Sequence, residues 1–324
     1  MKLMIHDEKT EKEITTFKNE GHIHRAFSRL VKKKLALACL VILAIIYLSG
    51  ISVDFISPYG YTDQDYTQIR QSPNSSHWLG TDRAGRDVFT RVLWGVQNTL
   101  ILTFVSMLTG GLVLGITMGL FSGYFGGYVD AVIQRSGEVV SSIPTFFLIL
   151  IISATVRPRI IEFVRLIEDN TVLEGLIRGG IVDYFVISLS LVSFGWIGTA
   201  RLVRGQILYL KETQFIDAAR SIGVSTFNIL FRHLLPNAIS PLIVTVTMGM
   251  GSMIGAEIFL SWIGLGIQPP RPSLGVMLWE SGNISVIRTE PWLMFAPGTV
   301  AFLMVLSWNL LGDALNDVFN PRTY

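Results

Sequence analysis

Charged side chains are scarce in this chain of 324 residues, of which they make up only 15%. Soluble domains usually carry about 25% charged residues. Hydrophobic residues account for 50% of the sequence, and the mean hydropathy is +0.50. A soluble core of this length cannot hide so much apolar surface from water, so the composition predicts a membrane protein with lipid as part of its solvent.

Several functional signatures are also missing. The single cysteine, Cys39, lies in an apolar run and cannot form an internal disulfide. The sequence contains no glycine-rich phosphate loop ending in Gly-Lys-Ser/Thr, no His-Glu-x-x-His string and no Gly-x-Ser-x-Gly string. The net charge of +2 is too small to indicate nucleic-acid binding. We therefore expect no catalytic residue, metal or cofactor in this chain, and we expect any hydrolytic chemistry on another polypeptide.

What the chain has instead is a series of long apolar runs. About twenty apolar residues span the hydrocarbon core, and lipid offers no hydrogen-bond partner to a bare backbone, so each span must be helical. The sequence predicts an all-α polytopic membrane protein with six transmembrane helices, at about Leu35–Phe55, Thr99–Tyr124, Val139–Val156, Tyr184–Val203, Ile239–Ile263 and Trp292–Leu311. The first run begins too far from Met1 for a cleaved signal peptide, so we interpret it as a retained span.

Basic residues next to the first span set the predicted orientation. Such residues favour the cytoplasmic side, and a cluster precedes the span: Arg25, Arg29, Lys32, Lys33 and Lys34. Other arginines fall on the predicted outside, so this cluster alone carries the prediction of a cell-membrane protein with both termini cytoplasmic. The predicted segments are a cytoplasmic tail (1–34), the first transmembrane helix (35–56), an extracytoplasmic loop (57–96), a helical core (97–315) with a cytoplasmic loop (205–237), and a cytoplasmic tail (316–324).

Within the cytoplasmic loop, the segment Thr213–Asn237 has the pattern of two short helices. The first, Gln214–Ile222, places four apolar residues on one predicted face: Phe215, Ile216, Ala219 and Ile222. Thr213 can cap this helix, and Ser225 can cap the second. The pattern therefore predicts an ordered loop rather than a flexible linker.

Individual residues indicate how these two helices end and what stabilises them. Asp217 and Arg220 lie three residues apart and can pair on the polar face. Gly223 tolerates the left-handed conformation that a helix terminus often needs. Pro236 lacks an amide hydrogen and suits the first turn of the following span.

The first helix of the loop has two interpretations. It could lie in the headgroup layer as an amphipathic anchor, or it could dock against another protein. Two adjacent alanines, Ala218 and Ala219, favour docking because they let another surface approach the helix backbone closely. An interfacial anchor would gain more from Leu, Phe or Trp at these positions.

The loop resembles the EAA loop of binding-protein-dependent ABC importer permeases. The match runs through Asp217-Ala218-Ala219, Gly223 and His233-Leu234-Leu235-Pro236-Asn237, with Asp217 in place of the usual Glu. In that family a short coupling helix docks in a cleft of the ATP-binding subunit. The resemblance implies that the following residues couple this chain to an ATPase: Phe215, Asp217, Ala218, Ala219, Arg220, Gly223, His233 and Pro236.

Five further strings resemble one branch of that family, the second membrane subunit of oligopeptide, dipeptide and nickel importers. They occur in one consistent order: HWLGTDRAGRDVFTRVLWG (77–95), GYFGGYVD (123–130), GWIGTARLVRGQIL (195–208), LSWIGLGIQPPRPSLG (260–275) and NLLGDALNDVFNPR (309–322). The chain departs from the branch at Asn316, where Arg is common, and in a longer segment Arg157–Asp183. The resemblance implies the type I ABC importer permease fold (MetI-like).

The same resemblance implies a set of partners. These are a second homologous permease subunit, one or two ATP-binding subunits that hold ATP and Mg, an extracytoplasmic solute-binding protein and the lipid bilayer. The strings 77–95 and 260–275 would face the solute-binding protein. The candidate contacts within them are Gly80, Asp82, Arg86, Asp87, Gly264 and Gly266.

Small and flexible residues recur inside the predicted spans. Four glycines follow one another every four residues and share one helical face: Gly111, Gly115, Gly119 and Gly123. Such a strip lets two helices approach closely in lipid, and we favour packing over a gating role. Met250 and Met253 in the fifth span are candidate pathway residues, although an adaptable filling role is favoured.

Glu257 is an acidic residue inside the fifth predicted span. A charge at the bilayer centre costs roughly 2.5–3.5 kcal/mol, so this side chain must face protein or water. It is either a pathway or gate residue or the acceptor of a helix–helix hydrogen bond, for which Ser261 is a candidate donor. The sequence does not decide between these two roles.

Together these features predict a membrane subunit of an ATP-driven, binding-protein-dependent importer, for oligopeptides or dipeptides. Import of nickel or a metal chelate by the same machinery is an alternative, because a separate binding protein largely sets the selectivity. An alternative of another class is an ion-coupled secondary transporter. That class should show buried ionisable residues in several spans and inverted repeats, and neither is clear in this sequence.

Overall fold

The computed structural model describes residues 29–171, 175, 177 and 179–319. In these ranges the chain is helical and contains no β-strand, only an isolated bridge between Thr81 and Asp87, which confirms the all-α prediction. The helices, with π-helices written η, are α3 (Lys34–Ile51), α4 (Val53–Ile56), α5 (Val88–Ser106), η1 (Met107–Leu114), α6 (Gly115–Phe125), α7 (Gly127–Ser142), α8 (Thr145–Asn170), α9 (Ile181–Leu210), α10 (Gln214–Ser221), α11 (Thr226–Asn228), η2 (Ile229–Leu234), α12 (Leu235–Asn237), α13 (Ile239–Trp262), α14 (Leu274–Ser281), α15 (Ile284–Thr289) and α16 (Trp292–Phe319).

Within the described part of the chain, five helical segments are long and apolar enough to cross a membrane: Lys34–Ile51, Val88–Phe125, Val182–Leu210, Ile239–Trp262 and Trp292–Phe319. A sixth span results if the bent pair α7–α8 counts as one. Two predicted loops are shorter than expected, since α5 already begins inside segment 57–96 and α9 extends into segment 205–237. Of the predicted tails, residues 1–28 and 320–324 lie outside the described residues, and residues 316–319 belong to α16.

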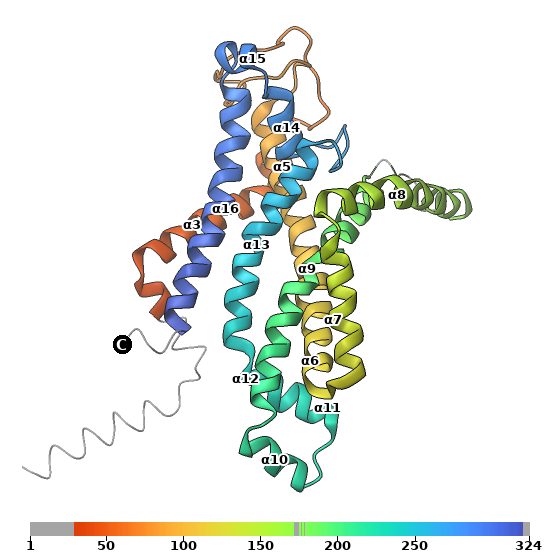
Figure 1. The fold of residues 1–324 in the computed structure, drawn as a ribbon. Coiled ribbons are helices and arrows are strands. Elements are labelled where there is room, and N and C mark those ends of the chain that lie inside the picture. The colour runs from red at the N-terminus through yellow and green to blue at the C-terminus, as the bar shows by residue number, and fades with distance from the viewer. Residues whose placement is uncertain (1–28, 172–174, 176, 178, 320–324) are drawn as a thin grey trace, which may run out of the picture.

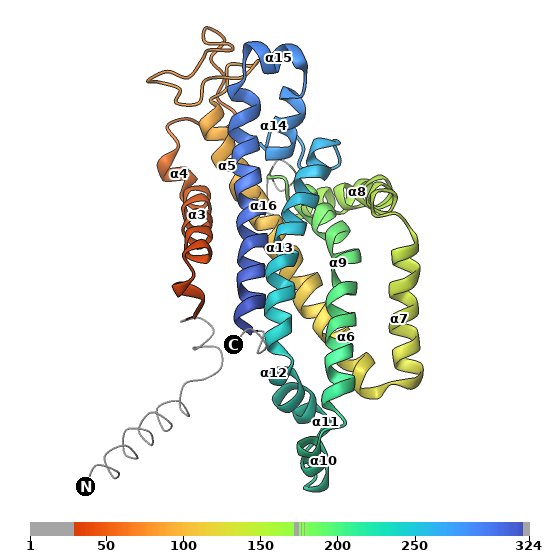
Figure 2. The same cartoon turned by 60° about the vertical axis from the view of Figure 1, so that its left-hand side comes forward.

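The third predicted span, Val139–Val156, is not one continuous helix. α7 ends at Ser142, and α8 leaves it at an angle of 91°. Ile143 and Pro144 between them are extended, with ψ of 123° and 129°. Proline clashes with the preceding residue in the helical conformation, which explains why the helix breaks here. Figure 2 shows α7 alongside the bundle and α8 turned across it.

Long helices surround a buried core in the half of the bundle that contains α14 and α15. α5, α13, α14 and α16 contribute its largest cluster, which includes Val96, Ile254, Leu274 and Met304. α3 lies on the outside of α16 (Figure 2). Apolar burial between helices from distant parts of the sequence therefore holds this half together.

α6 and α9 pack closely along a strip of glycines. A Cβ atom built on Gly115, Gly119 or Gly123 would lie 2.6, 2.6 and 2.8 Å from side-chain atoms of Thr199, Val203 and Ile207 on α9. Only glycine permits this approach, so the predicted packing role of these three residues agrees with the structure.

Gly111, the fourth residue of the predicted strip, does not face α9. Its place is taken by Gly110, where an added Cβ would lie 3.0 Å from the Cα of Val192. The cause is the π-helix η1, whose wider turn shifts the register by one residue. Gly110 and Gly115 are five apart, which is the π-helical spacing, and the spacing of four resumes in α6.

The two ends of the bundle differ in structure. At one end, α10 to α12 project beyond α9 and α13 (Figure 2). The start of α3 and the end of α16 lie toward the same end, where Lys33 Nζ and Asp317 Oδ2 form an ion pair of 2.9 Å. At the opposite end, the segment 57–87 folds beside α14 and α15 (Figure 1). We call these three parts together the cap.

Candidate functional site

One side of α10 is anchored to the bundle. Ile216 and Ala219 are 0% and 6% exposed. Ile216 packs in an apolar cluster with residues of α6, α9, η2 and α13: Leu120, Val203, Ile207, Ile229, Leu230, Leu234 and Leu242. Full burial of a large aliphatic side chain contributes about 1.5–3 kcal/mol. α10 is therefore fixed by packing as well as by its chain connections.

The remaining surface of α10 exposes apolar side chains. Phe215 and Ile222 are 43% and 81% exposed, and Ala218 is exposed as well. The four residues predicted to share one face therefore differ in burial, since only Ile216 and Ala219 are buried. Such a short helix touches the bundle along one narrow line and leaves both flanks free. Of the two predicted docking alanines, only Ala218 faces outward, whereas Ala219 faces this chain's own helices.

Gly223 terminates α10 as predicted. It has a φ of +77°, the left-handed conformation that glycine adopts without strain. Its N–H donates to the carbonyl of Arg220 (3.0 Å), and the N–H of Val224 donates to the carbonyl of Ala219 (3.1 Å). These two bonds form a Schellman motif, which satisfies carbonyls at the helix end.

The two predicted helix caps have different outcomes. Ser225 Oγ accepts from the backbone N–H of Asn228 at 3.5 Å, which confirms the cap of α11. Thr213 makes no side-chain cap to α10. Its hydroxyl donates instead to the carbonyl of Leu210 at the end of α9. The prediction for Thr213 is therefore wrong, and its side chain ties the turn before α10 to α9.

The other predicted coupling residues surround α10 without forming one surface. Arg220 pairs with Asp217 at 3.6 Å, and its guanidinium lies 5.6 Å from the ring centre of Tyr124 at the end of α6. His233 is half-buried in η2. Pro236 is exposed in the first turn of α12, directly before α13. The predicted ion pair is present, whereas Pro236 lies in the short helix α12 and not in the first turn of the span α13.

An ion pair that the sequence analysis missed lies near the same end of the bundle. Arg204 of α9 donates two hydrogen bonds of 2.6 Å to the carboxylate of Asp130 in the first turn of α7. Asp130 also accepts from the hydroxyl of Ser122 in α6. We call this arrangement the Asp130 clamp. Two parallel bonds between guanidinium and carboxylate fix orientation as well as distance.

Glu257 lies in a closed network between α5 and α13. Its side chain is fully buried, with 0% exposure. Thr99 Oγ1 donates to Glu257 Oε2 at 2.7 Å, and Ser261 Oγ donates to Glu257 Oε1 at 2.9 Å. The structure thus contains the hydrogen bond expected with Ser261 and adds a second one between helices.

The two methionines proposed for a pathway are also buried. Met250 and Met253 are each 7% exposed and pack with Met107 of η1. Together with Glu257, they line no exposed surface of this chain. The exposed residues of α13 lie on another flank and include Met248 and Phe259.

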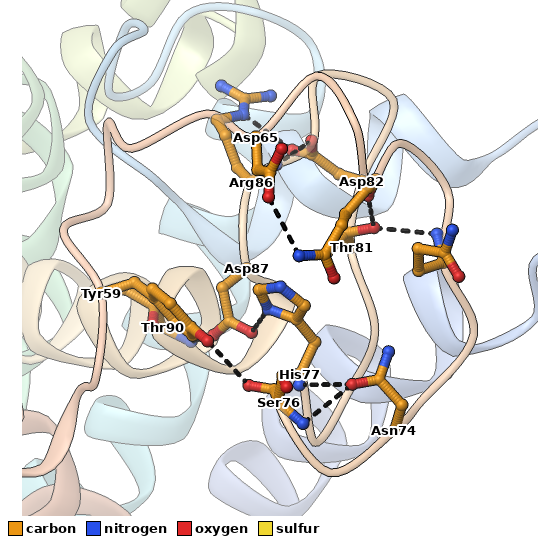
Figure 3. Close-up of polar contacts among 12 residues, drawn as sticks. Tyr59, Asp65, Asn74, Ser76, His77, Thr81, Asp82, Arg86, Asp87 and Thr90 are labelled. Carbon is orange, nitrogen blue, oxygen red and sulfur yellow. Dashed lines mark hydrogen bonds and ion pairs between the residues drawn. The ribbon is translucent and has the colours of Figure 1, made fainter.

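The predicted receptor contacts in segment 77–95 mostly stabilise the cap from inside (Figure 3). Asp82, which is 5% exposed, accepts from Arg91 and from Arg86 Nε (2.7 Å). Arg91 also donates to Glu280 of α14 at 3.1 Å. Asp82 and Glu280 thus join the start of α5 to α14 through two arginines.

A second cap contact fixes the start of α5. Asp87 accepts from the backbone N–H of Thr90 at 2.7 Å and lies 2.9 Å from His77 Nδ1 (Figure 3). Asp87 is 4% exposed, and Gly80 is buried against the ring of Trp292. The expectation that Gly80, Asp82 and Asp87 contact a partner directly does not fit their burial, because each is covered by its own chain.

In the second predicted string, the two glycines are placed differently. Gly264 is exposed in the turn after α13, with a φ of +82°. Gly266 is buried, and an added Cβ there would collide with Ser261. Only Gly264 is therefore open to a partner.

Comparison with known proteins identifies the family. Residues 111–323 match the binding-protein-dependent transport system inner membrane component family, and residues 23–73 match the N-terminal transmembrane domain of oligopeptide transport permease C. The chain belongs to the binding-protein-dependent transport permeases.

Among the relatives of this permease is the dipeptide transport system permease protein DppC of Bacillus subtilis, which is 33% identical over 92% of this chain and 85% of its own length. The oligopeptide transport system permease protein OppC of the same organism is 30% identical over 92% and 88%. The glutathione transport system permease protein GsiD of Pectobacterium atrosepticum is 33% identical over 91% and 89%. The permease thus aligns with these relatives over nearly its whole length.

The part of this permease that matches the family also contains the structural features around α10. The matched region 111–323 contains α10, the Asp130 clamp and the glycine strip. Across the described ranges, no group of three or more His, Cys, Asp or Glu side chains could hold a metal ion. The candidate functional site is therefore the exposed apolar surface of α10. The buried side of the same helix packs against α6, α9 and η2.

Proposed function

We propose that this permease is one membrane-spanning subunit of an ATP-driven importer of short peptides, paired with a second homologous permease and driven by separate ATP-binding subunits. The family supports the transport role, and the names of the relatives, which refer to dipeptides, oligopeptides and glutathione, favour peptides over nickel. The proposal rests on one observation: the short helix α10 has one buried side and an exposed apolar surface.

The proposed orientation puts α10 in the cytoplasm. Lys32, Lys33 and Lys34 stand at the start of α3, toward the same end of the bundle as α10. Because basic residues favour the cytoplasmic side of a span, this cluster supports a cytoplasmic α10 and an extracytoplasmic cap. A peptide-binding protein would then approach the cap, and ATP-binding subunits would approach α10.

A coupling role requires that α10 transmit force as a rigid handle. Turning a two-state gate from 1:99 to 99:1 needs about 5.5 kcal/mol of differential binding. Exposed ion pairs contribute at most about 1 kcal/mol each, so a few ion pairs between α10 and an ATP-binding subunit are too weak to supply it. The burial of Ile216 and Ala219 and the contact of Arg220 with Tyr124 give α10 the required connection to α6 and α9.

The test is a pair of tryptophan substitutions in adjacent residues of α10. In the complex reconstituted into proteoliposomes with its ATP-binding subunits, Ala218→Trp should abolish peptide-stimulated uptake while thermal stability stays unchanged, because residue 218 is exposed. Ala219→Trp should instead lower thermal stability, because residue 219 is only 6% exposed and a larger side chain would overpack its surroundings.

Thr62→Trp is the matched control, since residue 62 is exposed in the cap at the opposite end of the molecule. It should leave both ATP hydrolysis and uptake at the wild-type level. Normal uptake by the Ala218→Trp variant would refute the docking role of α10.

A further inference from the structure

The cap contains a cavity of about 840 Å³ that the functions discussed above do not use. It is enclosed by the segment before α5, the end of α13, α14 with the turn that follows it, and the start of α16. Sites that bind small molecules are usually concave and about 300–1,000 Å³ in volume. The size of this cavity therefore suits an inserted group.

The cavity has an apolar base and an aromatic rim. Met277 and Leu293 at the base are 4% and 7% exposed. Trp262, Trp279 and Ile284, which also line it, are 45%, 63% and 69% exposed. Exposed tryptophans around a concave apolar base are typical of protein–protein contact sites, where Trp and Arg contribute most of the binding free energy.

The charges that line the cavity leave one cation without a partner. Asp82 and Glu280 are both paired with Arg86 and Arg91, so these four charges balance. Arg83 is exposed, lines the cavity and forms no ion pair with any residue in the described ranges. The lining therefore carries one net positive charge that an incoming group can neutralise.

We propose that this cavity is a socket for a protruding segment of the extracytoplasmic binding protein, in which an Asp or Glu stands beside a large apolar residue. The acid would pair with Arg83, and the apolar side chain would enter between Trp262 and Trp279. This proposal rests on the proposed function and moves the expected receptor contact from the buried Gly80 and Asp87 to the cavity, whose lining includes two other expected contacts, Asp82 and Arg86.

The charge pattern favours a receptor segment over the transported peptide itself. A free peptide carries an ammonium group as well as a carboxylate. Both acids that line the cavity, Asp82 and Glu280, are already paired, so no carboxylate is left to bind that ammonium group. An acidic side chain within a folded receptor brings no such unmatched positive charge.

The experiment measures the affinity of the purified binding protein for the full transporter in nanodiscs. An exposed ion pair changes affinity by up to roughly fivefold, and charge reversal adds repulsion. Arg83→Glu should therefore raise the dissociation constant by about tenfold or more. Trp279→Ala should have an effect of similar size, because Trp279 is a large exposed side chain at the rim.

Arg135→Glu on α7 is the matched control, because Arg135 is 81% exposed and its reversal changes the net charge equally. It should leave the dissociation constant unchanged. Replacing the matching acidic residue of the binding protein by Lys should restore affinity for the Arg83→Glu transporter.

The possible results separate the socket from the proposed function. If the wild-type transporter binds the receptor and Arg83→Glu binds equally well, the socket is refuted and the import function stands. If the wild-type transporter does not bind it at all, the proposed function fails. If the loss occurs only in nanodiscs with phosphatidylglycerol and not in pure phosphatidylcholine, the cavity holds an anionic lipid instead. If affinity is unchanged but uptake of the peptide changes, the cavity serves the cargo.

Discussion

The close approach of α6 and α9 can be tested by placing a larger side chain between the two helices. Gly119→Val would place a Cβ 2.6 Å from Val203 Cβ and 2.7 Å from the backbone oxygen of Ala200. Carbon atoms prefer separations of about 3.5–4.0 Å, so the helices would have to separate by about 0.9 Å. The backbone oxygen cannot rotate away, and the two further methyl carbons of valine increase the overlap.

The magnitude follows from measured costs of overpacking. Such insertions usually cost about 1–3 kcal/mol, while valine gains only a few tenths of a kcal/mol over glycine in helix propensity. A net loss of about 2 kcal/mol is therefore expected for Gly119→Val. For a chain of 324 residues this corresponds to a fall of roughly 3 °C in the unfolding temperature.

The assay is thermal unfolding of the purified chain in nanodiscs, followed by tryptophan fluorescence at one fixed scan rate. Gly198→Val is the control, because it lies on α9, is exposed, and would meet no atom within 4 Å of its Cβ. Equal unfolding temperatures for Gly119→Val and Gly198→Val would refute the close packing of α6 against α9 at Gly119.

The same assay tests the register that η1 imposes. Gly110→Ala would press against the backbone of Val192, whereas Gly111→Ala would meet only the side chain of Met107, which can move. Gly110→Ala should therefore be the less stable variant. The opposite order would show that the helix continues without the π-turn.

Three further predictions concern polar contacts. Arg204→Asp or Asp130→Arg alone should cost roughly 1–3 kcal/mol in thermal unfolding, and combining them should restore part of the loss, because the Asp130 clamp is re-formed with reversed charges. Glu257→Ala should be less stable than Glu257→Gln in the same assay, because Ala leaves two buried hydroxyl donors unpaired. Hydrogen bonds from the hydroxyl and the backbone N–H of Thr67 hold the pKa of Asp65 below its usual value. The charged form therefore stabilises the cap above about pH 4. The hydrogen-exchange protection factors of segment 57–87, which correct for the intrinsic pH dependence of amide exchange, should be constant between about pH 5 and 8 and fall as the pH falls through that pKa, with a smaller fall in Asp65→Asn.

Local backbone chemistry made parts of α10 predictable, and tertiary packing made other parts unpredictable. Gly223 and Ser225 were assigned correctly because a left-handed helix end and a hydroxyl cap depend on neighbouring backbone atoms. The sequence does not show that Ile216 and Ala219 are buried while Phe215 and Ile222 are exposed, because burial in so short a helix depends on where it meets α6 and α9.

The errors in the spans have two different causes. The bend after α7 had a signal in the sequence, since Pro144 disfavours a helical conformation at Ile143. The π-turn in η1 had none, because Gly110 and Gly111 are identical residues, and which of them faces α9 depends on the packed helices.

The cap shows why charged residues in a loop are easily mistaken for surface contacts. Asp and Arg are almost never fully buried unless they are paired. Asp82 accepts hydrogen bonds from Arg86 and Arg91 and from backbone N–H groups, so it can be buried at little cost. The sequence shows that Asp82, Arg86 and Arg91 are close along the chain. It does not show that Glu280 of α14 also pairs with Arg91.

Under the proposed function, the glycine strip determines what α10 can move. α9 leads directly into α10, and its last three turns contact α6 at distances that only glycine allows. A force on α10 therefore displaces α6 and α9 together, because neither helix can slide past the other without a collision of Val203 or Ile207 with α6. The Asp130 clamp adds α7 to this unit through Arg204. α13 contacts these helices through apolar clusters near η2, near η1 and toward the cap. Apolar side chains can repack more easily than the backbones of α6 and α9 can separate, so we expect a change of shape at the boundary between α9 and α13.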